Sequence, residues 1–398
     1  MKFGLVVSRL DLYLLGVAFF LFISLNPYYV WGGYQLLYVS VFLVLVILSF
    51  RFYFIFSKTK SIWAILISFL VFIYSARLGA SYGGAIAFSC GTFLILAIKN
   101  TYLNSIAYKF RLLFVIVMAP GAILWVVHYF LGVDFLYLGA IDSQIIPNQI
   151  KVDEGVGYAS YPFAIVLDYM LEDQAYRLMG PFDEPGVVGT ICAFLLAANR
   201  FKINSKVDIL ILFYGILSFS LAFYFLVLFF LLVVSMRRPH YLLIIFLMSA
   251  FVFPAAHYNE TIYKYTLDRV KISGGEISGD NRENESLSEA FLRWKDSDIE
   301  GFLFGIPGYE NSGESTWKSI AITSGLLGVM NGVLILMLAI FTTRRDFDIY
   351  VIAFLLVFTA SIYQRPDVIN PFYIFIFCCG VFGLSKAGEG SSSIRYNK

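Results

Sequence analysis

Long apolar runs separated by short charged segments dominate the pattern of this chain. The runs extend over 14 to 25 residues and recur from Leu10 to Leu384, with interruptions such as RFYFIFSKTK (51–60) and TTRRDFD (342–348). Runs of this length match helices that cross a bilayer, where the helix itself satisfies the backbone polar groups. The pattern predicts spans near 10–25, 34–50, 61–75, 84–98, 112–129, 185–198, 209–220, 221–236, 241–255, 319–341, 349–363 and 372–384.

Basic residues are distributed unevenly around these spans. With the N-terminus inside, the inner segments hold 18 of the 29 lysines and arginines, whereas the short outer loops 26–33, 76–83 and 364–371 hold only Arg77 and Arg365. Lysine and arginine favour the cytoplasmic side of a membrane protein. We therefore expect a multi-pass protein with both termini in the cytoplasm.

The stretch Ile209–Met236 decides the topology, because its 28 residues are too long for one upright helix and short for two. Basic residues flank both ends, which favours a hairpin of two short helices that turns near Ser218–Leu221. A single tilted span would instead move the acidic segment 256–318 into the cytoplasm, and the charge distribution disfavours that.

Two polar segments remain on the outer side, 130–183 and 256–318, within a single membrane domain of residues 1–398. Loops of this length are usually functional or disordered, and these carry apolar patterning that disorder lacks. In the second loop, SLSE (286–289) is a capping box that predicts a helix, and GIPG (305–308) ends the unit. That helix would place four residues on one face: Leu287, Ala290, Phe291 and Trp294.

Composition agrees with an all-α polytopic membrane protein and with little else. The chain is 59% apolar and 14% charged, and no soluble core could bury that much apolar surface. The four cysteines lie in apolar segments without CxxC spacing, and the three histidines are scattered, so neither a disulfide framework nor a metal site is expected. A net charge of +2 gives no indication of nucleic-acid binding.

The most unusual segment is YRLMGPFDEPGVVGT (176–190), before the sixth predicted span. Pro185 suits the first turn of a helix, which puts Asp183 and Glu184 at its positive end. A purely structural interpretation is a helix cap beside a solvated arginine. The functional interpretation is an active site at membrane level, in which Arg177 binds a phosphate and Glu184 acts as general base toward a sugar hydroxyl.

The second outer loop offers further cations at Arg269, Arg282 and Arg293. Arg293 precedes Trp294 on the predicted helix, which would bring its guanidinium to the membrane surface. Arg282 and Arg293 could clamp a pyrophosphate at headgroup level, and ion pairing within the acidic loop is the equal alternative. The DSD sequence at 296–298 has metal-binding spacing but lies in an acidic helix, so no metal is expected there.

The chemistry is expected in the outer loops, since charges are scarce inside the spans and no nucleotide-binding P-loop exists. ATP is not available on that side. A transferase working there must take its group from an already activated donor, and a lipid pyrophosphate fits that constraint.

Three segments resemble the Wzy-type O-antigen and capsule polymerases, which are relatives of the O-antigen ligases. RLMGPFDEPGVVGT (177–190) is similar to a signature before a helix of that family. GDNR (279–282), the FxxW-type helix and LFGIPG (303–308) resemble its second periplasmic loop, and YQRPDVINPFY (363–373) resembles its last outer loop.

The resemblance implies a GT-C-like enzyme of the bacterial inner membrane that needs no metal or other cofactor. Such an enzyme moves a growing glycan from undecaprenyl pyrophosphate onto the non-reducing end of another carrier-linked repeat unit. Its partners would be the carrier-linked oligosaccharide, membrane lipid and a chain-length regulator. The implied roles are catalysis by Glu184, Arg177 and Asp183, and substrate binding by Arg282, Arg293, Arg269, Arg365 and Trp294.

One departure separates this chain from the ligases of the superfamily. They carry a histidine near the end of the second loop, where this chain reads GESTWKS (313–319). That favours a polymerase over a ligase that passes glycan to the lipid A core, and it leaves Glu310 or Glu314 open as the base instead of Glu184. A flippase or transporter of lipid-linked oligosaccharide is the alternative of a different class.

Overall fold

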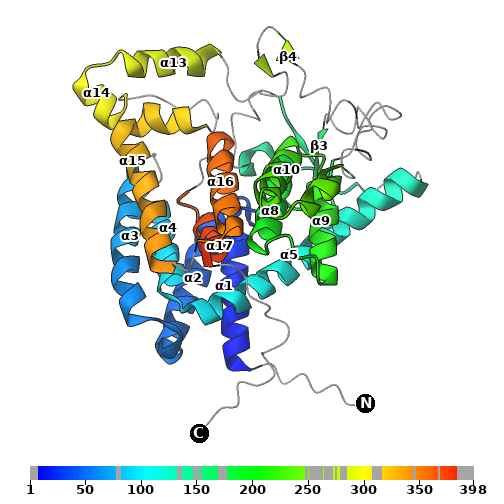
Figure 1. Ribbon diagram of the computed structural model, residues 1–398, viewed down its shortest axis with the longest axis horizontal. Coiled ribbons are helices and arrows are strands. Elements are labelled where there is room, and N and C mark those ends of the chain that lie inside the picture. The colour runs from blue at the N-terminus through cyan, green and yellow to red at the C-terminus, as the bar shows by residue number, and fades with distance from the viewer. Residues whose placement is uncertain are drawn as a thin grey trace.

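Helices make up most of the structure, which is a computed structural model (Figure 1). It describes residues 8–77, 82–131, 137–146, 152, 155–168, 177–246, 250, 263, 272–273, 276–277, 285–306, 316–343, 347–365 and 368–382. Its α-helices are α1 (Arg9–Ile23), α2 (Tyr34–Arg51), α3 (Lys58–Arg77), α4 (Tyr82–Ala97), α5 (Asn100–Leu131), α8 (Pro185–Ala198), α9 (Lys206–Leu217), α10 (Leu221–Ser235), α13 (Glu285–Lys295), α14 (Ile299–Phe304), α15 (Trp317–Thr343), α16 (Ile349–Gln364) and α17 (Pro371–Phe382).

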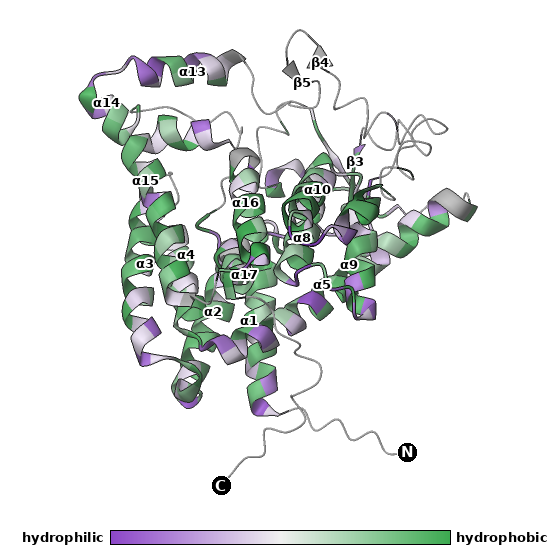
Figure 2. Cartoon of the chain, viewed as in Figure 1, coloured by the Kyte–Doolittle hydropathy of each residue, from purple (hydrophilic) through white to green (hydrophobic). Residues whose placement is uncertain are grey.

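Three of these helices are long and apolar enough to cross a membrane: Lys58–Arg77, Asn100–His128 and Trp317–Thr342. Hydrophobic residues cover them on several sides rather than along one stripe (Figure 2). Many outward side chains are large and apolar, such as Ile65, which is 62% exposed. Apolar surface of this extent is unfavourable in water and suits a lipid environment, so the mostly helical structure is compatible with the predicted membrane protein.

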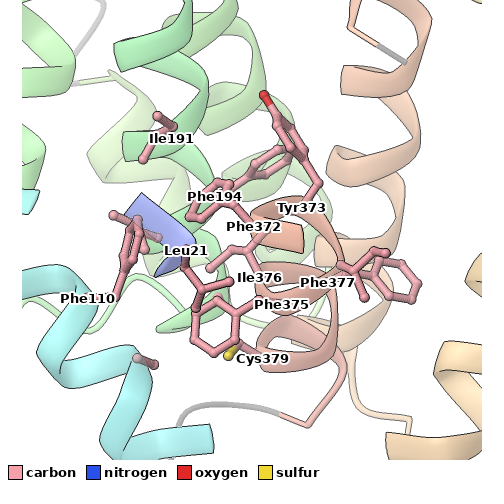
Figure 3. Close-up of a cluster of buried hydrophobic side chains, with 14 of the residues drawn as sticks. Leu21, Phe110, Ile191, Phe194, Phe372, Tyr373, Phe375, Ile376, Phe377 and Cys379 are labelled. Atoms are coloured by element: carbon pink, nitrogen blue, oxygen red, sulfur yellow. The ribbon is translucent and has the colours of Figure 1, made fainter. Parts of the chain in front are cut away.

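Two helices form the centre of the hydrophobic core. All residues of α17 from Pro371 to Val381 are buried, as is nearly all of α8. Their aromatic rings interlock with neighbours, because Phe194 stacks on Phe358 at 5.2 Å and Phe110 lies 4.9 Å from Phe372 (Figure 3). This packing fixes where α8 and α17 begin, and both begin beside the candidate site described below.

Three ion pairs lie at the ends of the helices that point away from the candidate site. Arg200, just after α8, pairs with Asp348, the N-cap of α16, at 2.8 Å. Lys109 of α5 pairs with Asp11 in the first turn of α1 at 2.9 Å. A third pair joins Arg111 of α5 to the buried Asp208 in the first turn of α9. The starts of α1, α9 and α16 are thereby fixed by basic partners.

The first loop contains a small antiparallel sheet that the all-α expectation did not include. β1 (Gly139–Ala140), β2 (Tyr158–Tyr161) and β3 (Ala164–Leu167) lie in that order, with Tyr158 opposite Leu167 and Tyr161 opposite Ala164. The turn between β2 and β3 contains only two residues, and Phe163 adopts φ 61° there. A second ladder pairs β4 (Ile272–Ser273) with β5 (Glu276–Ile277). The prediction of a purely helical chain is therefore wrong for these segments.

The predicted turn inside Ile209–Met236 is confirmed, since α9 ends at Leu217 and α10 begins at Leu221. Phe219 makes the turn with φ 43°. Short 3-10 helices complete the connections: η1 (Tyr28–Val30), η2 (Tyr53–Ile55) and η3 (Ser143–Ile145).

The predicted amphipathic helix is also present, as α13. Leu287, Ala290 and Trp294 are buried against α15, and Phe291 is partly buried beside them. Ser286 already lies within α13 (Glu285–Lys295), so it is not the N-cap residue that the predicted capping box requires. In Figure 1, α13 lies across the end of α15 at the top of the molecule.

Candidate functional site

The RLMGPFDEPG segment is held to neighbouring elements by three backbone hydrogen bonds. The Leu178 N–H donates to the Leu217 carbonyl at 3.0 Å, and the Gly180 carbonyl accepts from the Ile165 N–H of β3 at 2.9 Å. The Pro181 carbonyl then accepts from the Tyr28 N–H at 2.8 Å. The segment is thus a fixed connection between α9, the sheet and the loop after α1.

Two residues of this segment allow its close packing. Gly180 has φ 57°, and a Cβ there would lie 2.5 Å from the sulfur of Met118, so only glycine fits. Phe182 is fully buried, with its ring 5.8 Å from Phe22 and 6.2 Å from Phe114. The buried Phe182 fixes the chain directly before Asp183 and Glu184, which lie at the start of α8.

Glu184 forms an ion pair with an arginine far along the chain. It is the N-cap residue of α8 but makes no side-chain cap hydrogen bond. Its Oε2 instead accepts from Nη2 of Arg365, the C-cap residue of α16, at 2.5 Å. Gly186 makes room for the guanidinium, since a Cβ there would lie 2.7 Å from Nη2. The pair joins the start of α8 to the end of α16.

A cavity of about 220 Å³ lies beside this ion pair. α1 and α16 end at it, whereas α8 and α17 begin at it. Its charged lining consists, among the described residues, of Asp183 and Arg365. The remaining lining residues are Ser24, Leu25, Asn26, Trp31, Ile146, Tyr158, Val187, Asn370 and Tyr373.

Aromatic side chains form much of the cavity wall. Trp31 packs edge-on against Tyr158 with ring centroids 5.4 Å apart, and its Nε1–H donates to the Asn26 carbonyl at 3.0 Å. Tyr373 belongs to the core cluster with its ring, and its hydroxyl points away from that cluster (Figure 3). Aromatic rings beside amides and a carboxylate are the surfaces that bind sugars, whose C–H faces are apolar and whose edges are hydroxyls.

The two asparagines of the lining differ in their hydrogen bonding. Asn370 is fully engaged, because its Nδ2 donates to the Ser24 carbonyl at 2.6 Å while its Oδ1 accepts from Ser24 Oγ and from the Phe372 N–H. It fixes the start of α17 against the end of α1. Asn26 has φ 54°, and its Oδ1 is buried without a hydrogen-bond partner among the described residues.

Arg177 does not line this cavity. Its side chain is buried, its Nη2 donates to the Phe219 carbonyl at 2.9 Å, and its Nε donates to the Ser218 carbonyl at 3.3 Å. A cation at the C-terminal end of α9 satisfies carbonyls that the helix leaves unpaired. The guanidinium of Arg177 therefore contacts the carbonyls after α9, and its predicted role beside Glu184 stays a prediction.

Of the candidate residues in the second loop, the structure describes those on α13 and α14 and leaves the others outside the described residues. Arg293 is 71% exposed on α13 and lies 3.9 Å from Glu289, one turn away, and Trp294 is buried with its Nε1–H donating to the Phe302 carbonyl. Neither lines the cavity, because α13 packs on α15. Asp298 of the DSD sequence caps α14 by accepting from the Gly301 N–H. Outside the described residues lie Arg269, Arg282, Glu310 and Glu314.

The sequence analysis did not identify three residues that line the cavity: Trp31, Tyr158 and Asn26. A signal exists for the first loop, since NPYYVWGG (26–33) gathers three aromatic residues between turn formers in an outer loop almost free of charge. Burial raises the pKa values of Tyr28 and Tyr29 above their usual range, so both phenols stay protonated at neutral pH. Neither phenol therefore offers a proton acceptor beside the cavity at neutral pH.

Fold and site together define a helical membrane protein with a polar, aromatic-walled cavity where four helices begin or end. A scan against protein-family models and searches of curated proteins and of solved structures found no match to this chain.

Proposed function

We propose that this chain is a membrane glycosyltransferase that polymerises oligosaccharide repeat units, as the Wzy-type O-antigen and capsule polymerases do. One observation carries the proposal: Asp183 of the first motif and Arg365 of the last outer loop line the same cavity. These residues come from two of the three segments that resemble the family.

The helix arrangement supports a bundle of about twelve spans with a GT-C-like layout in the bacterial inner membrane. α8 and α16 run in opposite directions, with Glu184 and Arg365 at one end and Arg200 and Asp348 at the other. The cavity end is then periplasmic, and the end with the basic ion pairs is cytoplasmic, as the positive-inside rule requires.

The reaction transfers a glycan without an external energy source. A hydroxyl of the acceptor sugar attacks the anomeric carbon of the donor glycan, and the new C–O bond replaces the bond to the carrier diphosphate. Undecaprenyl pyrophosphate leaves with the electron pair, and the hydroxyl proton passes to a carboxylate. No oxidant, reductant or nucleotide is needed.

The cavity lining favours Asp183 as the proton acceptor rather than Glu184, because Asp183 lines the cavity and Glu184 does not. The Oε2 atom of Glu184 accepts from Arg365 beside the cavity. In this assignment Glu184 and Arg365 orient the site, and Arg177 positions the motif through α9. Arg282 and Arg269 remain proposed contacts to the carrier diphosphate.

The decisive experiment uses purified protein in lipid nanodiscs with a synthetic undecaprenyl-pyrophosphate-linked repeat unit. We expect a ladder of products that differ by one repeat unit, and its loss in Asp183→Asn. Transfer to lipid A core in place of the ladder would indicate a ligase. Movement of the carrier-linked unit across the bilayer without new glycosidic bonds would indicate a flippase.

A further inference from the structure

We infer that the protein has a glycan-binding surface outside the cavity, formed by Tyr29 and Phe163, on which sugars next to the reacting one stack. The inference rests on the proposed function and adds a substrate subsite to it. A series of aromatic rings that leads away from the cavity and an unfavourable turn conformation at an exposed ring support it.

The series of rings connects the cavity wall to the protein surface. Trp31 lines the cavity, its ring centroid lies 6.5 Å from that of Tyr28, and the Tyr28 centroid lies 4.4 Å from that of Tyr29. Exposure rises along the series, from 7% for Trp31 to 42% for Tyr29. A saccharide whose reacting end lies in the cavity would therefore meet further rings as it continues outward.

The hairpin of the small sheet adds one more exposed ring at the end of this series. The Tyr29 hydroxyl donates to the Phe163 carbonyl at 3.0 Å, so the two residues are neighbours. Phe163 lies in the turn between β2 and β3, and its side chain is 64% exposed. Packing in the protein core therefore does not explain the large apolar side chain at this position.

The backbone conformation makes a phenylalanine costly in this turn. Pro162 precedes Phe163, whose φ is 61°. A turn with proline at its first central position and a positive φ at its second normally has glycine or asparagine there, because most other side chains are strained in that region. Strained residues concentrate at functional and ligand-binding sites. The exposed Phe163 ring is thus better explained by a ligand than by folding.

The surface suits a saccharide better than an anionic lipid headgroup. The Tyr28 N–H donates to the Pro181 carbonyl at 2.8 Å, which fixes the ring series to the segment before α8. Rigid aromatic rings offer contact area at low entropic cost, and they stack on the apolar C–H faces of sugars. Headgroup recognition instead uses clusters of lysine and arginine, and neither 26–33 nor 158–167 contains a charged residue.

The test measures glycan binding directly, without turnover. The probe is a carrier-free fragment of the cell's own surface polysaccharide, three repeat units long, titrated calorimetrically into purified protein in lipid nanodiscs. Phe163→Asn removes one ring and places a residue that tolerates the positive φ, and Tyr29→Ala removes the other ring. Tyr137→Ala is the matched control, because Tyr137 is 55% exposed before β1 of the same sheet but packs on Tyr161, outside the ring series.

We expect Phe163→Asn and Tyr29→Ala each to weaken binding of the fragment about fivefold, the effect of one lost stacking contact. Tyr137→Ala should bind as wild type. Unchanged affinity in Phe163→Asn, an equal loss in Tyr137→Ala, or no binding by the wild-type protein would overturn the inference. If Tyr29→Ala does not fold, Phe163→Asn decides alone.

Two further measurements identify the cause of a negative result. Unchanged glycan affinity together with a lower thermal unfolding temperature of Phe163→Asn in nanodiscs, but not in detergent, would show that the surface contacts the membrane instead. A wild-type protein that makes the product ladder keeps the polymerase proposal intact whatever the binding result. Absence of that ladder refutes the proposed function itself.

Discussion

Arg177 shows how a residue with an apparent catalytic signature can be explained by the backbone that it contacts. Its guanidinium donates to two carbonyls just after α9, and the side chain is buried. A buried donor of this kind contributes mainly to the stability of the turn, because its removal leaves those carbonyls unpaired.

We expect Arg177→Ala to lower the free energy of unfolding by about 2 kcal/mol, together with activity. Arg293→Ala is the matched control, since its side chain is 71% exposed, and should change stability by less than about 0.5 kcal/mol. Thermal unfolding in detergent compares the two. An Arg177→Ala protein with wild-type stability and no activity would support a direct contact to substrate instead.

Glu184 and Arg365 form the ion pair beside the cavity, and both side chains are largely shielded from water. Removing one partner takes the ion-pair compensation from the other charge, so Glu184→Gln and Arg365→Gln should each cost about 2 kcal/mol of stability. The double variant should cost about 1 kcal/mol less than the two single losses together. Additive losses in that cycle would mean that the two residues act independently.

At the scale of elements, α14 and α15 meet through two glycines. α14 ends at Gly305 with φ 92°, and α15 bends at Gly325 with φ 65°. A Cβ on Gly325 would lie 2.3 Å from the Leu303 carbonyl oxygen, and one on Gly305 would lie 2.5 Å from the backbone of Thr323. The two backbones touch directly, and this contact holds the α13–α14 unit on the end of α15.

We expect Gly325→Ala to destabilise the protein by more than about 2 kcal/mol, since both the conformation and the space are unsuitable for a side chain. Gly83→Ala in α4 is the control, because a Cβ there meets nothing within 4 Å and alanine favours a helix. Limited proteolysis of the α13–α14 unit should accelerate only in Gly325→Ala. Equal cleavage rates would show that the glycine contact does not hold the unit.

The helices were predictable because their apolar runs are long and end at charges, prolines or glycines, as with Pro185 at the start of α8. The small sheet was not, since four-residue strands joined by a two-residue turn leave little pattern in a polar loop. The pairing of Glu184 with Arg365 was also out of reach, because 181 positions separate them. Sequence reasoning located both segments but could not show that their charges neutralise each other.

At the scale of the whole molecule, the cavity and the basic ion pairs lie at opposite ends of the central helices. A membrane between these ends makes a prediction about access, tested in a Cys90→Ser background because Cys90 is partly exposed, whereas Cys192, Cys378 and Cys379 are buried. Ile299→Cys, at a position 79% exposed on α14, should react with a membrane-impermeant thiol reagent in intact spheroplasts. Lys58→Cys, at the start of α3, should react only after permeabilisation. The opposite labelling pattern would show that the protein has the opposite orientation in the membrane.

The cavity draws its lining from residues as early as Ser24 and as late as Tyr373. Helices are inserted into a membrane in the order of their synthesis, so this lining is incomplete until translation has passed α17. A nascent chain that still lacks its last helix can already occupy the bilayer, yet its cavity is not closed. Under the proposed function, catalytic competence would arise in one step near the end of translation, and the lipid carrier would not meet a partly built enzyme.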